Sequence, residues 1–534
     1  MIRVRQIKVE INNDSFDIVQ KKVLTKLKLS FKDIKDMTIV KKSIDARDKN
    51  SVLFNYEVNV LLLDEEKYLK KNKSSDIAKI EDVIYKIPKS GRVLLKNRPV
   101  VVGAGPCGLF CTLILAENGY NPILIERGER VEDRTNTVEQ FWKRGILNTE
   151  SNVCFGEGGA GTFSDGKLNT LVNDKEGRIK KVYDTFIQCG APIEISYDSK
   201  PHIGSNALKD VIKNLRNRIL KLGGTILYHS CLTNVEIVDN KIESIVINKR
   251  KRVPCDCLVL AIGHSARDTI EMLYDKGLNM ESKAFAVGLR VQHSQKMISE
   301  SQYGKFAKDL PPASYKLTYQ ASNNRGVYTF CMCPGGYVVN SSCEEGHLMI
   351  NGMSNHERDS ENANSAVVVT VDKKDFGPNP LDGMKYQRQL EALAFRKGNG
   401  KIPIQLLGDY KKNKISDHFG GINPVFKGKT SFANLNEIFP YYINDSIKEA
   451  MDDFGKKIKG FNNPDTILAG VESRTSSAVR MERDKDLVSN IKGIYPSGEG
   501  AGYSGGITTS AIDGIRTAEK IIEKYTNKSI KKDL

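Results

Sequence analysis

The sequence has no long apolar run and no signal-peptide core. No uninterrupted apolar stretch approaches the roughly 18 residues that a membrane-spanning helix requires. The first ten residues, MIRVRQIKVE, alternate charged and apolar side chains and lack the continuous apolar centre of a secretory signal. We therefore expect a soluble protein of the cytoplasm, without a membrane partner.

The cysteine pattern excludes two further kinds of site. The ten cysteines include no C-x-x-C motif, which argues against flavin-to-disulfide exchange of the thioredoxin-reductase kind. No His and Cys cluster has zinc-binding spacing, because Cys255-x-Cys257 and Cys331-x-Cys333 place alternate residues on one face of a strand. We expect reduced thiols, as in other cytosolic proteins, and no metal site.

Positive charge exceeds negative charge, since 81 Lys and Arg stand against 65 Asp and Glu, for a formal net charge of +16. Such a balance is compatible with binding to nucleic acid or to an anionic surface. The excess is mostly scattered lysine, and the densest cluster is only KRKR at residues 249–252. An ordinary solvated surface is the favoured interpretation, and a nucleic-acid partner remains an alternative.

The most informative segment is 98–128, RPVVVGAGPCGLFCTLILAENGYNPILIERG. It predicts a buried strand at 100–102, a G-x-G-x-x-G turn, a helix and a second strand that ends in Glu126. The glycines allow a tight turn and a close approach of pyrophosphate, and the acid lies where a ribose hydroxyl would bind. These elements in this register predict an adenine-dinucleotide site.

The C-terminal segment 493–518, GIYPSGEGAGYSGGITTSAIDGIRTA, predicts a strand, a glycine-rich turn and a helix from residue 507. Many flavoproteins close their FAD site in this way, because the partial positive charge of a helix N-terminus stabilises anionic reduced flavin. A third apolar strand, CLVLAIG at 257–263, follows a predicted β-hairpin at 232–247. This order resembles the glutathione-reductase-type flavoproteins, except that the acid in the last turn is Glu499 instead of the usual Asp.

Four motifs narrow this resemblance: FGEGGAGTFSDGKL at 155–168, CPGGYV at 333–338, RTSSAVR at 474–480 and GEGAGYSGG at 498–506. Together they resemble a family of FAD-dependent dehydrogenases of bacteria and plastids whose reaction is not established. The resemblance extends over nearly the whole chain and implies FAD as the cofactor. The cofactor contacts predicted from the motifs and the resemblance are Gly103, Ala104, Gly105, Pro106, Cys107, Gly108, Glu126, Arg127, Gly158, Gly159, Ser164, Lys167, Val235, Ala261, Gly263, Gly498, Glu499, Gly505, Gly506, Ile507 and Thr508.

Five residues are candidates for chemistry, and each has a structural alternative. Lys167 would neutralise reduced flavin, or be a surface lysine. Arg474, with Ser476 beside it, would reach the substrate side of the flavin and clamp a carboxylate, or form a structural ion pair. Cys333 would be a redox thiol or a buried strand-end cysteine, and His264 a proton donor or a capping residue.

The chain of 534 residues is long enough for several cores, and its 40% hydrophobic and 27% charged residues are typical of globular proteins. We expect an α/β protein with a Rossmann-like FAD-binding domain of the glutathione-reductase type, divided between residues 96–282 and 464–528. Residues 283–463 would form an inserted α+β cap that holds substrate. Residues 1–92 predict a β-α-β-β-α order with a closing strand, a ferredoxin-like module with an interface or regulatory role.

These predictions favour an FAD-dependent oxidoreductase that moves a hydride between an unidentified small molecule and flavin N5. No second strand–G-x-G-x-x-G–helix unit is present, so NAD(P)H, if it is the electron donor, would dock transiently. One alternative is an FAD-dependent RNA-modifying enzyme whose basic N-terminal module presents RNA. The other is a flavoprotein that uses FAD as a structural ligand or redox sensor.

Overall fold

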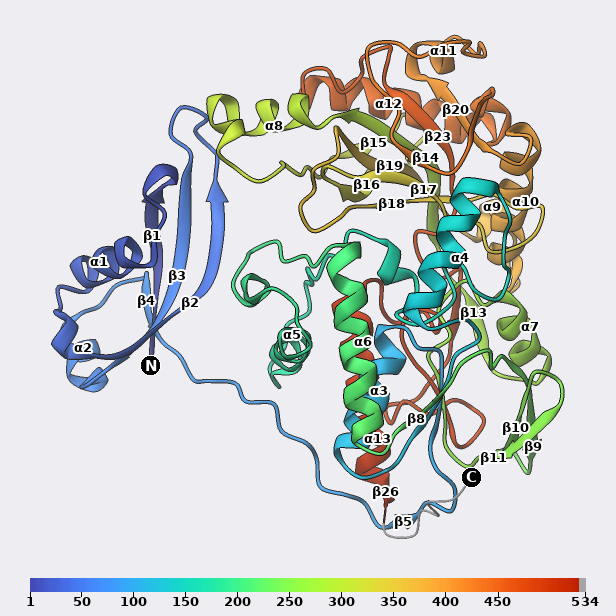
Figure 1. Ribbon diagram of the computed structural model, residues 1–534, viewed down its shortest axis with the longest axis horizontal. Coiled ribbons are helices and arrows are strands. Elements are labelled where there is room, and N and C mark those ends of the chain that lie inside the picture. The colour runs from blue at the N-terminus through green and yellow to red at the C-terminus, as the bar shows by residue number, and fades with distance from the viewer. Residues whose placement is uncertain (528–534) are drawn as a thin grey trace.

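The computed structural model describes residues 1–527. Three parts, each built on a main β-sheet, make up the molecule (Figure 1). A small N-terminal module lies to one side, a parallel sheet with its helices forms the lower body, and a large, mostly antiparallel sheet forms the upper body (Figure 1). Among the described residues, no helix is both long and apolar enough to cross a lipid bilayer.

The N-terminal module is an antiparallel sheet covered by two helices. Its strands, in the order β2-β3-β1-β4, are β1 (Ile2–Glu10), β2 (Ile34–Asp45), β3 (Leu53–Leu62) and β4 (Ile77–Lys79), and its helices are α1 (Phe16–Leu27) and α2 (Glu65–Lys71). Alternate residues of β1 are buried, as a half-buried strand requires. After Lys71 the chain turns and adds β4 to the edge of β1, which closes the β-α-β-β-α order with a last strand.

The middle part is a parallel sheet assembled from distant pieces of chain. Its strands, in the order β25-β12-β6-β7-β8, are β6 (Val100–Val102), β7 (Ile123–Ile125), β8 (Thr225–Leu227), β12 (Leu258–Leu260) and β25 (Ile494–Pro496). Its helices are α3 (Pro106–Glu117), α4 (Val131–Arg144), α5 (Arg178–Gln188), α6 (Ser205–Lys221), α7 (Arg267–Asp275) and α13 (Ile507–Lys524). The residues of β6, β7 and β12 are all buried, as is usual for short parallel strands.

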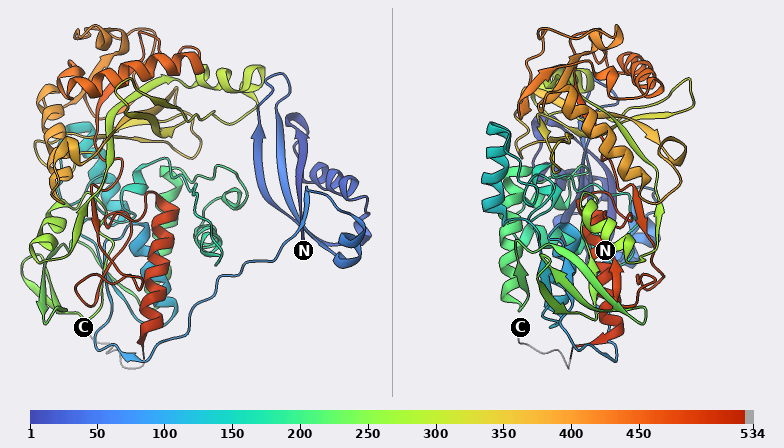
Figure 2. Two further views of the ribbon diagram at one scale, coloured as in Figure 1. Left: turned by 180° about the vertical axis from the view of Figure 1, so that it is seen from behind. Right: turned by 90° about the vertical axis from the view of Figure 1, so that its right-hand side faces the viewer.

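A three-stranded antiparallel excursion precedes β12. Its strands, in the order β11-β10-β9, are β9 (Leu232–Val238), β10 (Lys241–Ile247) and β11 (Lys251–Pro254). Behind the molecule, α13 stands upright beside the strands of the parallel sheet, and it packs against α3 (Figure 2). This packing brings the first turns of α3 and α13, which are about 400 residues apart in the sequence, to the same edge of the sheet.

The third part is the cap sheet, defined here as the seven strands in the order β15-β16-β19-β14-β23-β20-β22. They are β14 (Phe285–Ser294), β15 (Thr318–Gln320), β16 (Gly326–Cys333), β19 (Asn362–Val371), β20 (Ile402–Leu406), β22 (Thr430–Phe432) and β23 (Ile467–Glu472). A smaller sheet beside it contains β17 (Tyr337–Asn340), β18 (Ile350–Met353) and β21 (Phe426–Lys427). The helices are α8 (Gln295–Tyr303), α9 (Lys373–Phe376), α10 (Asp382–Lys397), α11 (Leu407–Lys411) and α12 (Tyr441–Lys457).

The chain crosses between the parallel sheet and the cap sheet at two adjacent points. On the way up it forms β13 (Met280–Ser282), and on the way back β24 (Val479–Met481), and these two strands pair antiparallel. Because β23 pairs with β14 and β20, the chain leaves the cap sheet only after residue 472 and not at residue 464 as expected from the sequence. The last predicted residue of this segment, 528, lies outside the described residues.

An extended linker joins the N-terminal module to the body (Figure 1). At its end, β5 (Val93–Leu94) pairs with β26 (Tyr525–Thr526). The module also contacts the body directly, because the Lys42 N–H donates to the Tyr197 carbonyl at 2.7 Å and the Ser199 N–H to the Lys42 carbonyl at 2.9 Å. Tyr303, Phe306 and Leu310 pack against the core of the module, which therefore touches the body by backbone pairing and by apolar contact.

Candidate cofactor site

A long cavity follows the carboxyl edge of the parallel sheet and ends against the cap strands. It contains about 1600 Å³ of empty space, its open mouth included. The cavity brings together most of the predicted cofactor residues. Those in its wall are Gly103, Gly105, Pro106, Cys107, Glu126, Arg127, Gly159, Ser164, Lys167, Ala261, Gly263, Glu499, Gly505, Gly506 and Ile507.

The turn between β6 and α3 forms one end of the cavity. Gly105 is the N-cap of α3 and Pro106 its first residue, so the first N–H groups of the helix have no capping side chain. A Cβ atom on Gly108 would lie 1.8 Å from the Gly103 carbonyl oxygen, so the third glycine allows the helix to pack on the turn. A Cβ atom on Gly105 would meet only the Gly159 Cα, at 3.8 Å. Glycine at this open position keeps room for a ligand.

Glu126 lies at the tip of β7 and is buried. Its Oε2 atom accepts a hydrogen bond from the Ala104 N–H at 2.7 Å, and Oε1 accepts from the Gly128 and Gly156 N–H groups, both at 2.9 Å. The carboxylate therefore ties the glycine turn, the end of β7 and the segment at residue 156 together. Because each carboxylate oxygen has more than one acceptor position, Glu126 can hold these amides and also accept a ribose hydroxyl.

The start of α13 forms a second helix end in the same wall. The helix begins at Ile507 after Gly506, whose φ of +135° only glycine adopts readily. A Cβ atom on Gly505 would have no neighbour within 4 Å, so this backbone also borders open space. Two helix N-termini, those of α3 and α13, thus direct partial positive charge into one cavity, which suits an anionic ligand.

The segment 155–168 is held in place by a buried arginine that sequence reasoning missed. Arg134 on α4 is fully buried and donates to the carbonyls of Asn152, Val153, Glu157 and Gly159 at 2.7–2.9 Å. Burial lowers the pKa of Arg134 to about 10. The available signal was an arginine on the buried stripe of an amphipathic helix, where an apolar residue is the usual occupant.

The opposite end of the cavity carries the cap residues and Lys167. The Lys167 ammonium donates to the Met332 carbonyl on β16 and lies 3.7 Å from the Asp165 carboxylate. Asp165 also accepts two hydrogen bonds from Arg358. Burial acts to raise the pKa of Asp165, but Lys167 and Arg358 outweigh it and hold that pKa below its ordinary value. Cys333 lies in this wall as a buried strand-end residue.

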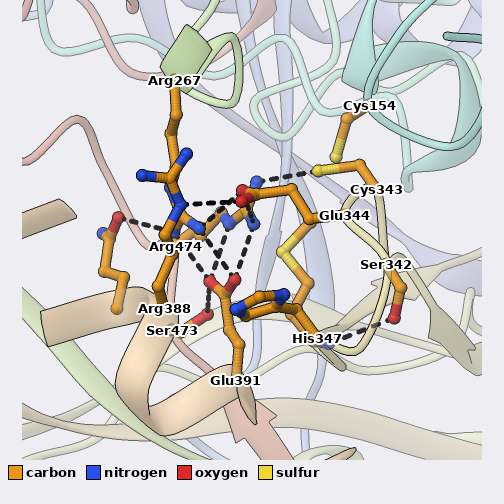
Figure 3. Close-up of polar contacts among 12 residues, drawn as sticks. Cys154, Arg267, Ser342, Cys343, Glu344, His347, Arg388, Glu391, Ser473 and Arg474 are labelled. Atoms are coloured by element: carbon orange, nitrogen blue, oxygen red, sulfur yellow. Dashed lines mark hydrogen bonds and ion pairs between the residues drawn. The ribbon is translucent and has the colours of Figure 1, made fainter. Parts of the chain in front are cut away.

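A buried charge cluster joins the cap to the parallel-sheet part beside the cavity (Figure 3). The carboxylate of Glu391 on α10 accepts bidentate hydrogen bonds from Arg267 and Arg474, at 2.7–2.9 Å, and one from the Ser473 hydroxyl at 2.7 Å. Glu344 pairs with both arginines, at 2.7 and 3.2 Å. Burial opposes ionisation, but Arg267 and Arg474 hold the pKa of Glu391 well below its usual range.

These contacts decide between the two interpretations of Arg474. Its guanidinium borders the cavity but already forms ion pairs with Glu391 and Glu344. The structure therefore contains the structural ion pair, and Arg474 is not free to clamp a substrate carboxylate. Ser476 does not line the cavity, although Thr475 does. The His264 ring lies in the wall with its Nδ1 atom 3.3 Å from the Glu499 carboxylate, so the expected proton donor faces the acid of the last turn.

Six predicted cofactor residues lie behind the wall rather than in it, namely Ala104, Gly108, Gly158, Val235, Gly498 and Thr508. Several of these residues hold the segments of the cavity wall in place through hydrogen bonds. The Gly158 N–H donates to the Ala104 carbonyl at 2.8 Å, the Gly498 N–H donates to Asp513 at 2.7 Å, and the Thr508 hydroxyl donates to the Leu168 carbonyl at 2.8 Å. Val235 is fully buried in the apolar core of the hairpin, which accounts for its position away from the cavity.

The residues of the wall fit an FAD molecule. Glu126 and the glycine turn suit an adenosine and its pyrophosphate, and a long cavity continues from them past the α13 N-terminus to the cap strands. Gly263 and Gly505 border space in which a Cβ atom would meet nothing within 4 Å. Within residues 1–527, no group of three or more His, Cys, Asp or Glu side chains is placed to hold a metal ion.

Comparison with known proteins agrees with this cofactor. Residues 284–475 match the family model of the FAD-dependent protein, C-terminal domain-like, and residues 1–61 match a domain of unknown function. An uncharacterised protein of Clostridium beijerinckii is 49% identical over 531 residues, which cover 98% of this chain and 99% of the relative. The chain belongs to the same family as this uncharacterised Clostridium protein. FAD is its cofactor.

Solved structures show only distant likeness. The chain is similar to a flavin-dependent brominase (12% identity, TM-score 0.36, covering 80% of this chain and 79% of the other). It is similar to an L-amino acid deaminase from Proteus vulgaris, with 14% identity, a TM-score of 0.33, and coverage of 82% of this chain and 96% of the other. It is also similar to a glycine oxidase from Bacillus cereus, with 12% identity, a TM-score of 0.32, and coverage of 80% of this chain and 95% of the other. Similarity at this level carries no conclusion about substrate or reaction.

Proposed function

We propose that the protein is an FAD-dependent oxidoreductase in which a hydride moves between a small-molecule substrate and flavin N5. FAD supplies the electron-accepting ring when it is bound. In this proposal the parallel sheet and its helices are a discontinuous FAD-binding domain of the glutathione-reductase type. The cap sheet holds the substrate, and the N-terminal module is a ferredoxin-like accessory.

One observation carries the proposal: a single cavity, which is not fully enclosed, runs from the dinucleotide turn to the cap strands. At one end lies the Glu126 carboxylate, and at the other lie Asn351 and the exposed Cys331. The Lys167 side chain, which keeps 34% of its surface exposed, borders the same end. A purely structural FAD requires no access for solvent or substrate at the end far from the adenosine. An open end under a separate cap sheet favours catalysis.

The residues of the wall would act by charge and by exclusion of water. The N-terminus of α13 and the Lys167 ammonium are positive groups on the cavity, so they would stabilise negative charge on a reduced ring. The charge cluster around Glu391 fixes the cap on the parallel-sheet part and would keep the wall closed beside the ring. Positioning and electrostatics are therefore the contribution that we assign to the protein.

The proposed electron donor is NADH or NADPH that docks transiently. The strand–G-x-G-x-x-G–helix unit at β6 and α3, whose third glycine lies inside the helix, is used by the proposed FAD site. The glycine turn between β25 and α13 lines the same cavity and forms no second nucleotide site. A nicotinamide would therefore have to enter through the open end at Lys167 and leave again before a substrate is reduced. The position of Lys167 suits this role, because both pyridine nucleotides carry phosphate groups.

The test is anaerobic reduction of the FAD-loaded protein by NADH and, separately, by NADPH, followed by flavin absorbance near 450 nm. We expect rapid bleaching by one of the two nucleotides and slow or no bleaching by the other. Free FAD in the same buffer controls for uncatalysed reduction. Lys167→Gln, which keeps a polar side chain but removes its charge, should slow the reduction and raise the nucleotide concentration that half-saturates it.

A flavin that neither nucleotide nor a graded series of redox dyes reduces would contradict the proposal and favour a structural role for FAD. Bleaching by dyes but by neither nucleotide would overturn only the assignment of the donor. Lys167→Gln with unchanged reduction kinetics would remove Lys167 from the proposed site while leaving the cavity in place.

A further inference from the structure

Two cysteines that are far apart in the sequence meet at the cavity wall. Cys154 lies in the segment before Phe155, and Cys343 lies in the loop between β17 and β18. Figure 3 shows their sulfur atoms side by side, and Cys154 packs against the small apolar cluster that contains Cys343. The Cys154 thiol donates to the Ser341 carbonyl at 3.6 Å. Both are free thiols, and no spacing motif reveals the pair because 188 residues separate them in the sequence.

The arginine Arg474 contacts this thiol pair and is itself held by two carboxylates. Arg474 donates a hydrogen bond from Nη1 to the Cys343 sulfur at 3.0 Å. Its remaining nitrogens are held by Glu391 and Glu344, so the guanidinium keeps its position whatever the state of the thiols. Arg474 acts to lower the pKa of Cys343, but Cys154 and burial outweigh it and raise that pKa, so Cys343 stays a thiol. Arg474 also acts to lower the pKa of Cys154, which favours the thiolate, the nucleophilic form of cysteine.

Cys154 differs in its environment from the other cysteines. The neighbouring Cys343 thiol and, to a smaller extent, Arg474 outweigh burial and lower the pKa of Cys154 below its ordinary value. All ten cysteines lie within residues 1–527, and removal from water by the surrounding protein raises the pKa of eight of them, including Cys331, whose free surface faces the cavity. Those eight are Cys107, Cys111, Cys189, Cys231, Cys255, Cys257, Cys331 and Cys333.

Small molecules can reach Cys154 through the cavity. Cys154 is partly exposed and lies in the cavity wall, whereas Cys343 is buried behind it. A reactive thiol with a low pKa, an accessible surface and a second thiol in contact has the features of a redox-sensing pair. The two chain segments come from different parts of the fold, so a bond between them would tie the cap to the parallel-sheet part.

We propose that Cys154 and Cys343 form a reversible disulfide, with hydrogen peroxide as the oxidant. The Cys154 thiolate attacks one peroxide oxygen and the O–O bond breaks, which gives a sulfenic acid and a hydroxide that takes up a proton. The Cys343 sulfur then attacks the Cys154 sulfur, the S–O bond breaks, the S–S bond forms and a second water leaves. Two thiols lose two electrons and two protons, and one peroxide becomes two waters. A small dithiol reverses the reaction.

The experiment uses the reduced full-length protein and hydrogen peroxide. After a short exposure the remaining thiols are alkylated, and unreduced peptides are mapped by mass. We expect one cross-linked peptide pair, joining residues 154 and 343 and lacking two hydrogens, which disappears after treatment with dithiothreitol. In Cys343→Ser the cross-link is lost, and Cys154 instead accumulates as a sulfenic acid that a dimedone probe captures.

Cys331→Ser is the matched control, because Cys331 is exposed in the same cavity and has Cys333 two residues away. It should leave the cross-link unchanged. Arg474→Lys tests the positioning residue, and it should shift the pH midpoint of Cys154 alkylation upward relative to the wild type measured in parallel. Peroxide that leaves both thiols reduced, or that joins Cys331 to Cys333 first, would overturn the proposal. So would a Cys154 product in Cys343→Ser that is the same as in the wild type.

Discussion

Gly105 offers the clearest separation of cofactor binding from folding. Its φ of −76° and ψ of −179° are open to any residue, and an added Cβ atom would meet only the Gly159 Cα at 3.8 Å. Gly105→Ala should therefore leave the stability of the protein without FAD nearly unchanged, or raise it by up to about 1 kcal/mol through the unfolded chain. The added methyl group points into space that the pyrophosphate would fill.

The expected loss of FAD affinity follows from overpacking. Forcing a methyl group into a close-packed contact costs about 1–3 kcal/mol, which corresponds to a rise in Kd of roughly 5- to 150-fold. Gly105→Val, with a larger side chain at the same position, should lose more. The assay is titration of the apoprotein with FAD, followed by quenching of flavin fluorescence, with thermal unfolding of each apoprotein measured in parallel.

Gly108→Ala, in the same turn, should lower the stability of the apoprotein, in contrast to Gly105→Ala. Its Cβ atom would lie 1.8 Å from the Gly103 carbonyl oxygen, so this variant should unfold at lower temperature before any FAD is added. The reasoning is refuted if Gly105→Ala binds FAD as tightly as the wild type. It is equally refuted if Gly105→Ala lowers apoprotein stability as much as Gly108→Ala does, because the position would then be structural.

Two further predictions concern stability. Glu391→Gln removes the buried carboxylate shared by Arg267 and Arg474 and leaves them only the partly exposed Glu344, which should lower the free energy of unfolding by about 3–5 kcal/mol in urea denaturation. The control Glu345→Gln, at an exposed position, should change it by less than about 0.5 kcal/mol. His293 is buried, and burial lowers its pKa to about 4, so the native state excludes a proton that the unfolded state binds below about pH 6.5. Stability should fall as pH drops from 6.5 towards 4, by up to about 3 kcal/mol, and a stability difference between the wild type and His293→Gln that does not vary over this range would contradict the assignment.

Local chemistry made the dinucleotide turn predictable. The apolar run at residues 100–102, the glycines and Glu126 each have a local physical reason, and the structure places β6, α3 and β7 at these positions. The start of α13 was predictable for the same reason, since a glycine-rich turn precedes a run with helical periodicity. In both places, residues close together in the sequence determine where the helix begins.

Tertiary contacts made the remaining features unpredictable. Arg134 holds carbonyls that lie 18 to 25 residues away, and its role depends on how that segment folds back. The cluster of Arg267, Glu391 and Arg474 comes from three separate segments, so no spacing indicates it. Val235 was assigned to the cofactor from the resemblance alone, but the hairpin buries it in apolar core.

The most direct test of the account compares FAD with FMN on the apoprotein. If Glu126 and the glycine turn at Gly105 hold the adenosine half, FAD should bind at one molecule per chain and at least about 100-fold more tightly than FMN, a difference of about 2.7 kcal/mol. Equal affinity for the two flavins would show that the adenosine end of the cavity is not used. Absence of FAD binding to correctly folded protein would contradict the cofactor site itself.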